Sequence, residues 1–246
     1  MLGIFKKQGR KNKNVFDYSS LMVDMHSHVL PGIDDGAKTP DESIVLIKKM
    51  MALGITKIIA TPHIMADYYK NTADTINASL EILKTALKKE EIAIEIEAAA
   101  EHYFDETFEN MVKKKELLTM GDNFVLFEFS FISPPSNVWQ AVQKLKESGY
   151  KPILAHPERY QYMDFEQYAT LHDQGVYFQL NTISLTGYYG KQVKKTAENL
   201  VDKQLIDFIS SDMHHLRHAE AFERALKMPY LEKLLFHYPL KNIMLR

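Results

Sequence analysis

Histidines and carboxylates recur in short groups along the chain, and both residue types bind metal ions. The groups are Asp24-Met-His26-Ser-His28, Thr61-Pro-His63, Glu101-His102, Glu128, His156-Pro-Glu-Arg159 and Ser211-Asp212-Met-His214. One His-x-His pair alone is weak evidence, because core or surface histidines give the same pattern. The whole set is difficult to explain by folding alone, since buried imidazoles and carboxylates cost free energy unless they are paired or coordinated. The sequence therefore predicts a metal centre.

The chain contains no cysteine, so its candidate ligands are nitrogen and oxygen atoms. Such donors suit manganese, iron, zinc or magnesium. The candidate ligands are too many for one tetrahedral zinc ion, so we expect two or three divalent ions that share a bridging carboxylate. Clusters of this kind activate water near neutral pH and stabilise both the attacking and the leaving oxygen of a phosphate ester. The expected chemistry is metal-dependent hydrolysis of a phosphoester, without a cysteine-phosphate intermediate.

The candidate ligands follow segments that are predicted to be strands. Apolar segments rich in β-branched residues predict strands at 21–25, 55–60, 92–99, 124–129, 152–155, 176–180 and 206–210. Helical spacing predicts helices at 43–53, 72–90, 106–115, 138–148, 165–174 and 191–202, with further helical segments to the end. Thr39 before Pro40 indicates an N-terminal cap.

This alternation predicts an α/β fold, a distorted (β/α)7 TIM-like barrel. No glycine-rich phosphate-binding motif follows the first predicted strand, which disfavours an open doubly wound sheet. In a barrel, active sites form at the carboxyl ends of the strands, where the candidate ligands stand.

The composition is that of an ordinary globular protein. Of 246 residues, 46% are hydrophobic and 25% charged, and the formal net charge is −2, so nucleic acid is disfavoured as a partner. We expect a basic N-terminal arm at 1–16 and one catalytic barrel domain at 17–246. The apolar part of the arm is too short for the core of a signal peptide. The chain contains no uninterrupted run of about 18 apolar residues, the length that is needed to span a membrane. A cytoplasmic protein is expected, whose arm is either a disordered tail or makes peripheral contact with anionic lipid or an acidic partner.

Further segments match a known enzyme family. They are Asp34-Asp35-Gly36, Ala60-Thr61-Pro62-His63, Phe127-Glu128-Phe129, Ala155-His156-Pro157-Glu158-Arg159 and Ser210-Ser211-Asp212-Met213-His214. In order and spacing the sequence resembles the polymerase and histidinol phosphatase (PHP) superfamily. Within it, the sequence is similar to the bacterial manganese-dependent protein tyrosine phosphatases of capsule and exopolysaccharide operons. The resemblance covers about residues 21–226 and implies the PHP fold.

The resemblance also implies a ligand set. The first ion would be held by His26, His28, Glu101 and Asp212, the second by Glu101 as bridge with Glu128 and His156, and the third by Asp35, His63 and His214. Many relatives have histidine in place of Asp35 and Glu128, and carboxylates there resemble the tyrosine phosphatase branch. These oxygen donors favour manganese, or iron, over zinc.

Two arginines are candidate catalytic residues. Arg159 would face the same mouth, and its planar guanidinium suits two phosphate oxygens, although it could also cap the following helix. The family places a second arginine a few residues after the final Asp-x-His, and Arg217 lies near that position. No general acid is assigned, and His102 and His215 are expected behind the ligands or on the surface.

Other residues are given weaker roles. The remaining histidines, His172, His218 and His237, are interpreted as surface or packing residues. Four tyrosines, Tyr160, Tyr162, Tyr188 and Tyr189, are assigned to core or rim packing, with contact to a phosphotyrosine ring as the alternative. The loop at 131–136 is a candidate specificity wall.

The function implied by the resemblance is a protein tyrosine phosphatase, a phosphoric monoester hydrolase. Its expected substrate is a phosphotyrosine protein, the tyrosine-rich tail of a membrane-bound kinase that controls capsular polysaccharide or exopolysaccharide synthesis. The alternative is a small-molecule phosphatase of the histidinol phosphatase type. An exonuclease of the superfamily and a binding protein without catalysis are less favoured. The residues alone support only metal-dependent phosphoester hydrolysis, because one fold can host many substrates.

Overall fold

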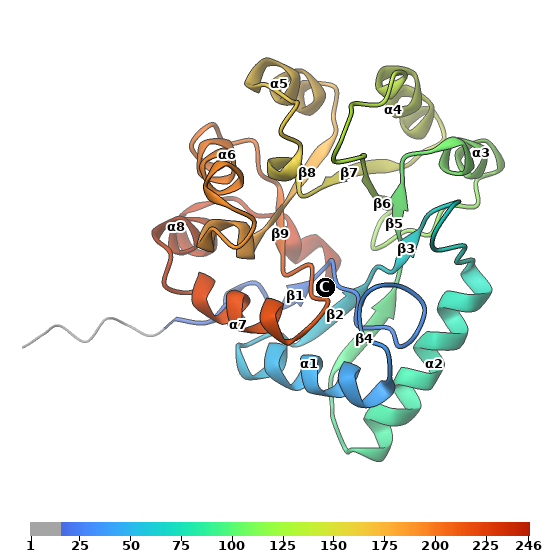
Figure 1. Cartoon of the computed structure of the whole chain (residues 1–246), viewed down its shortest axis with the longest axis vertical. Coiled ribbons are helices and arrows are strands. Elements are labelled where there is room, and N and C mark those ends of the chain that lie inside the picture. The colour runs from blue at the N-terminus through green and yellow to red at the C-terminus, as the bar shows by residue number, and fades with distance from the viewer. Residues whose placement is uncertain (1–15) are drawn as a thin grey trace, which may run out of the picture.

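The computed structural model describes residues 16–246, in which parallel strands alternate with helices (Figure 1). The predicted basic arm at 1–16 lies outside the described residues except for Phe16. The strands are β1 (Val23–Asp24), β2 (Lys57–Ala60), β3 (His63–Ile64), β4 (Glu95–Ala98), β5 (Glu101–Tyr103), β6 (Phe124–Glu128), β7 (Lys151–Ala155), β8 (Tyr177–Asn181) and β9 (Phe208–Ser210). The helices are α1 (Pro40–Ala52), α2 (Ala73–Lys89), α3 (Glu106–Lys114), α4 (Val138–Glu147), α5 (Phe165–Asp173), α6 (Lys191–Asp202), α7 (Leu216–Ala225) and α8 (Pro229–His237).

The strands form two hydrogen-bonded sheets, one in the order β1-β2-β4 and one in the order β3-β5-β6-β7-β8-β9. The predicted second and third strands correspond to β2 and β4, and after breaks at 61–62 and 99–100 each is followed by a short strand, β3 or β5, that pairs in the other sheet. Pro62 has no N–H for a ladder hydrogen bond, which explains one break. β3 and β5 are not predicted from the sequence, because strands of two or three residues are too short to show alternation.

The two sheets still close into one barrel. The Ala99 N–H donates to Ala60 O (2.8 Å), which carries the pairing across the breaks. At the seam, the residues after β1 pair with those after β9: Ser27 bridges Met213, and the His28 N–H donates to Met213 O (2.8 Å). The predicted distorted seven-stranded barrel is confirmed.

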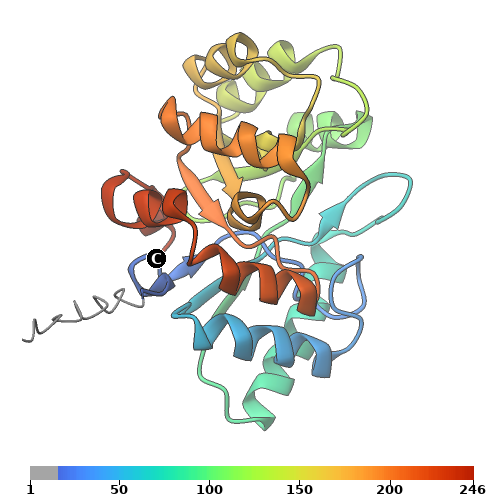
Figure 2. The ribbon, with the colours of Figure 1, turned by 60° about the vertical axis from the view of Figure 1, so that its left-hand side comes forward.

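Alternate residues of the strands face two cores. On β6, Phe124 and Leu126 belong to a small cluster inside the barrel, while Val125 and Phe127 belong to the large cluster between strands and helices. Because both faces of β6 are buried, this strand is a nearly continuous apolar run, whereas β4 alternates between buried and exposed residues. The helices cover the outside, as the turned view in Figure 2 shows.

Helix and barrel ends are fixed by specific hydrogen bonds. The predicted cap and first turn are confirmed, since Thr39 accepts from the Glu42 N–H (3.3 Å) and α1 begins at Pro40. At the amino-terminal end of the barrel, buried Asn242 donates to the carbonyl oxygens of Ile209 (2.8 Å) and Val23 (3.3 Å). The Asn242 side chain therefore joins β1 and β9 at that end. Among residues 16–246, no helix has both the length and the apolar character that crossing a membrane requires.

Candidate metal centre

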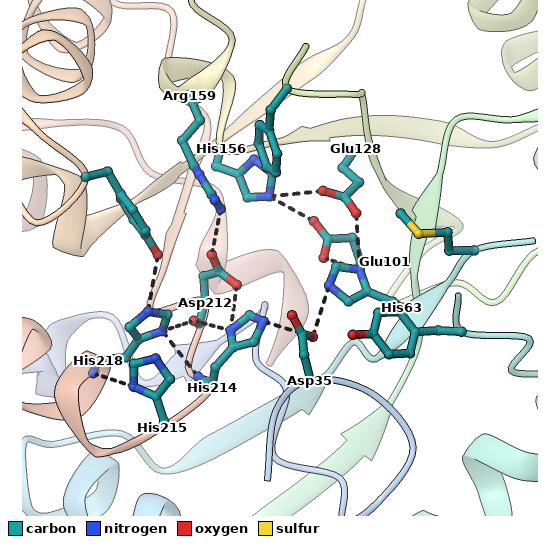
Figure 3. A pocket seen from close by; sticks show the side chains of 14 residues that line it. Asp35, His63, Glu101, Glu128, His156, Arg159, Asp212, His214, His215 and His218 are labelled. Atoms are coloured by element: carbon teal, nitrogen blue, oxygen red, sulfur yellow. Dashed lines mark hydrogen bonds and ion pairs between the residues drawn. The ribbon is translucent and has the colours of Figure 1, made fainter. Parts of the chain in front are cut away.

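A cavity of about 380 Å³ lies at the carboxyl ends of the strands, where the sequence predicts the active site. Its lining residues are Asp35, His63, Met65, Tyr69, Glu101, Glu128, Phe131, His156, Arg159, Tyr189, Asp212, His214, His215 and His218. Figure 3 shows that their side chains converge. His26 and His28 are completely buried next to Glu101 and Asp212. The structure therefore brings all nine predicted metal ligands together.

The residues assigned to the first ion meet at one point. The Nε2 atoms of His26 and His28 lie 3.2 Å apart, because residues two apart after β1 point to the same side. Glu101 Oε2 lies 3.2 Å from His26 Nε2 and 3.4 Å from His28 Nε2. Asp212 Oδ1 lies 3.4 Å from His28 Nε2. Two nitrogens and two oxygens thus face a common centre.

Glu101 also faces a second group, as expected of a bridging carboxylate. Its Oε1 lies 3.0 Å from His156 Nε2, and Glu128 Oε2 lies 3.8 Å from the same nitrogen. His63 Nδ1 lies 3.1 Å from Glu101 Oε2 and 3.2 Å from Glu128 Oε1. His63 therefore contacts the second group as well as the third, to which the family resemblance assigns it.

The third group lies at the rim. Asp35 Oδ1 is 3.5 Å from His63 Nε2 and 3.4 Å from His214 Nε2, and the Asp35 side chain is half exposed. The buried ring of His28 stacks on that of His214, with the ring centres 3.9 Å apart. This group is open to solvent, whereas the first is not.

The chemistry of the donors fits divalent ions. Three sets have ligand atoms within 4.8 Å of one another: His28, Asp35, His63 and His214; His26, His28 and Glu101; and His63, Glu101 and Glu128. The Nδ1 of His63 is buried and makes no hydrogen bond among the described residues, although carboxylate oxygens of Glu101 and Glu128 lie 3.1 and 3.2 Å away. Burial by itself would raise the pKa of Glu101, but His26 and His63 hold it well below its ordinary value. The Glu101 carboxylate is therefore ionised, which is the form that binds metal ions.

Residues behind the ligands fix their orientation. Gln179 Oε1 lies 2.9 Å from His26 Nδ1, so the Nε2 atom is left to face the centre. Asn181 donates from Nδ2 to Asp212 Oδ2 (2.9 Å). Neither Gln179 nor Asn181 was predicted from the sequence. The sequence feature that could have identified them is the presence of two polar residues, at positions 179 and 181, at the end of a strand predicted to be buried.

The Asp34-Asp35-Gly36 segment lies against the backbone of His28. Asp34 Oδ2 lies 2.8 Å from His28 Nδ1, and its Oδ1 accepts from the Gly36 N–H (2.9 Å). A Cβ atom at Gly36 would lie 2.0 Å from His28 O, so only glycine allows this approach. Asp34 thus orients a ligand, while its neighbour Asp35 faces the cavity.

Two predicted ligands have an unusual backbone conformation. His156 has φ 32° and Asp212 has φ 50°, both in the left-handed region that non-glycine residues rarely adopt. Each stands directly after a strand segment, where the chain turns and directs the side chain into the cavity. Such strain persists at functional sites because the surrounding structure holds it.

Arg159 is held over the cavity as expected. Its guanidinium carbon lies 4.2 Å from the centre of the Phe131 ring and 4.4 Å from that of Tyr189. Its Nη1 lies 3.4 Å from Asp212 Oδ2. The cation lies between two aromatic faces with its side chain 23% exposed, so it is ordered and still accessible to an anion.

Arg217 is not brought into this cavity. It is exposed on α7 and lines a neighbouring hollow with His214, His215 and Leu216. His218, which was expected to be a surface or packing residue, is buried and lines the cavity, with Nδ1 2.9 Å from Asp212 O. Burial lowers the pKa of His218 to about 4.

Aromatic and apolar side chains form part of the cavity wall. Phe131, from the loop predicted as a specificity wall, lines it together with Tyr69 and Met65. Of the four tyrosines singled out in the sequence, Tyr189 alone lines the cavity. Tyr160 is fully buried and accepts from the Phe129 N–H (3.0 Å), which confirms a packing role.

His102 is also directed away from the cavity. It is completely buried, and its Nδ1 lies 3.1 Å from Leu126 O. Burial lowers the pKa of His102 to about 4, so its imidazole is neutral. His102 therefore packs behind the ligand Glu101 and does not face a substrate.

Comparison with known proteins gives a consistent result. The family model for capsular polysaccharide synthesis, CpsB/CapC, matches residues 22–236. The tyrosine-protein phosphatase YwqE of Bacillus subtilis is 34% identical over 199 residues, which cover 80% of this chain and 78% of YwqE. One crystal structure superimposes on this chain with a TM-score of 0.80 at 32% identity, over 91% of each chain. It comes from work on YwqE of Bacillus subtilis and CpsB of Streptococcus pneumoniae, which are described as unique metal-dependent tyrosine phosphatases. Histidinol phosphate phosphatase of Lactococcus lactis aligns with a TM-score of 0.50 at 12% identity, over 84% of this chain and 92% of the other, and so shares the fold alone.

Proposed function

The chain belongs to the capsular polysaccharide synthesis CpsB/CapC family, and from that membership and its site we infer that it is a metal-dependent protein tyrosine phosphatase. One observation carries the chemistry: Arg159 lies within ion-pair distance of Asp212, a predicted metal ligand, in the same cavity. A phosphate monoester carries up to two negative charges, and its hydrolysis is accelerated by positive groups arranged around the phosphoryl oxygens.

We assign the ions to the three groups of side chains. His26, His28, Glu101 and Asp212 would hold the first ion, Glu101, Glu128 and His156 the second, and Asp35, His63 and His214 the third. Support comes from the distances of 3.0 to 3.8 Å between ligand atoms within these groups. The mixed nitrogen and oxygen donors favour manganese, with iron, zinc and magnesium as alternatives. When bound, these ions would activate water and polarise the phosphate.

The residues around the centre then have separate roles. Arg159 donates hydrogen bonds to the phosphoryl oxygens and stabilises the charge that develops on them. Asn181 keeps the Asp212 carboxylate oriented through its 2.9 Å hydrogen bond. Tyr69, Phe131 and Met65 offer an apolar wall for the phenyl ring of phosphotyrosine and exclude water. A phenolate leaving group has a pKa of about 10 and needs less protonation than an alkoxide, so no strong general acid is required.

The substrate that we propose is phosphotyrosine in the tyrosine-rich tail of a membrane-bound kinase that controls capsular polysaccharide or exopolysaccharide synthesis. The family description and the half-exposed rim at Asp35, which leaves room for a polypeptide, support this substrate. A cytoplasmic location and a peripheral membrane contact through the basic arm belong to the same proposal. If removal of residues 1–14 changes neither membrane association nor activity on the kinase tail, the contact through the arm is refuted.

The test of the activity is phosphate release by metal-stripped protein after separate addition of manganese, iron, zinc or magnesium. The substrates are a phosphotyrosine peptide, the same peptide with phosphoserine, and histidinol phosphate, with H26A as the site control. We expect activity with manganese and preference for phosphotyrosine. A preference for histidinol phosphate would instead indicate a small-molecule phosphatase, and no hydrolysis with any metal would refute an enzymatic role.

A further inference from the structure

A second hollow of about 630 Å³ opens next to the metal cavity. Its lining residues are Asp41, Glu42, Val45 and Leu46 of α1, His214 and His215 of the preceding loop, and Leu216 and Arg217 of α7. Figures 1 and 2 both show α1 and α7 side by side next to the barrel. His214 and His215 also line the metal cavity, so the two share a rim. A chain that leaves the cavity over these histidines enters the hollow directly.

The hollow has an apolar surface. Val45 is 43% exposed and Leu216 is 50% exposed, while Leu46 between the helices is buried. Single exposed apolar residues are common on protein surfaces, but a concave apolar surface that adjoins a reactive site is typical of binding sites. An isolated phosphate monoester in the metal cavity would leave this surface uncovered.

The two sides of the hollow differ in charge. Arg217 is exposed and makes no ion pair within residues 16–246, so its guanidinium is available to a ligand. On the other side, Asp41 and Glu42 stand in the first turn of α1, where the helix dipole stabilises acids, and Glu42 accepts from the Lys38 N–H (2.8 Å). Arg217 is therefore the cation that an acidic ligand group would meet.

We propose that this hollow binds the residues next to phosphotyrosine in the substrate protein, an apolar side chain between Val45 and Leu216 and a carboxylate at Arg217. The inference rests on the proposed function, because it requires phosphotyrosine in the adjoining cavity. An extended peptide advances only about 3.3 to 3.6 Å per residue, and the cavity and the hollow share a rim at His214 and His215, so residues close to phosphotyrosine in the chain can enter the hollow. Arg217 would then select the substrate rather than bind its phosphate.

The test uses phosphotyrosine peptides that differ at two positions on each side of the phosphotyrosine. At each position Leu is compared with Ser, and Glu with Gln and Lys, and kcat/KM is divided by that for p-nitrophenyl phosphate, which has no flanking residues. At one or two positions we expect Leu to exceed Ser about three- to tenfold, for a partly buried side chain. We expect Glu to exceed Gln about two- to fivefold, as for an exposed ion pair.

Charge reversal gives the sharper result. R217E should prefer Lys to Glu at the same position. R224E, which makes the same charge reversal at an exposed residue further along α7, should keep the original order. Equal metal content in both variants verifies that the site is intact.

Each possible result discriminates between the proposals. Normal phosphotyrosine hydrolysis without any flanking preference, or with a preference that R217E does not change, would overturn this inference and leave the proposed function standing. If flanking residues have no effect and L216D converts a dimer to a monomer by light scattering, the hollow binds a second copy and the inference is wrong. Absence of phosphotyrosine hydrolysis with every metal would overturn the function and this inference together.

Discussion

Replacement of Arg159 by alanine tests how the cavity binds phosphate. The guanidinium lies between the rings of Phe131 and Tyr189, at 4.2 and 4.4 Å, and its side chain is 23% exposed. It is therefore ordered before substrate binds, and little side-chain entropy is lost on binding. Most of its interaction with the phosphoryl group is then available for catalysis.

The size of the effect follows from that arrangement. A hydrogen bond to a charged group contributes about 1.5 to 3 kcal/mol, and a guanidinium can donate two to one phosphoryl group. We expect R159A to lose about 3 to 4 kcal/mol of transition-state stabilisation, or about 100- to 1000-fold in kcat/KM, with a raised KM. R159K should recover only part of this, because an ammonium group cannot donate the same pair of bonds or stack between rings.

The assay is steady-state hydrolysis of a phosphotyrosine peptide, with metal content measured by mass spectrometry on the same samples. Metal should be retained in R159A, since Asn181 still donates to Asp212 at 2.9 Å. R224A, an exposed arginine of α7, is the matched control and should behave as the parent. A loss of less than about tenfold, or a loss of bound metal, would refute the assigned role.

Three further predictions concern the metal centre. H26A and D212A should each lower metal content and activity together, and full activity in either variant would contradict the ligand assignment. Q179M removes the group at His26 Nδ1 and should weaken metal binding about 10- to 100-fold in a manganese titration; an unchanged affinity would show that Gln179 does not orient the ligand. In metal-free protein, burial alone would lower the pKa of His63, but Glu101 and Glu128 raise it to about 9. Because this pKa is above that of the unfolded chain, about 6.5, the protonated imidazole stabilises the fold. The stabilisation is complete below about pH 6.5 and is lost as the pH rises through 9. The melting temperature of metal-stripped protein should fall over that interval, and H63Q should remove part of the fall; a flat profile would contradict the pKa assignment.

The order of elements and the predicted ligands could be found from the sequence because both signals are local. The apolar runs at 124–129 and 206–210 are buried on both faces, and such runs are visible without knowledge of their neighbours. His26 and His28 lie two apart in an extended segment, which alone places them on one side. Thr39 before Pro40 likewise marks the start of α1 within four residues of sequence.

Residues that act through distant partners could not be found in this way. Gln179 orients His26 from more than 150 positions away in the sequence, and Asn181 orients Asp212 from more than 30 positions away. A polar residue on a strand does not by itself reveal such a partner. His218 is a different case: its partner Asp212 is only six residues away, but their contact depends on how α7 is placed after the seam of the barrel. The breaks before His63 and Glu101 also appear only when neighbouring strands are paired.

The sequence by itself determined which residue types could bind metal, the strand or loop that carries each, and through its resemblance the class of reaction. Tertiary structure alone decided that Glu101 lies between two groups of ligands, that Arg159 is enclosed by Phe131 and Tyr189, and that Arg217 faces a different hollow. The physical reason is that the direction of a side chain in a strand follows from its local period, whereas convergence of side chains depends on barrel closure, which pairs residues far apart in the chain.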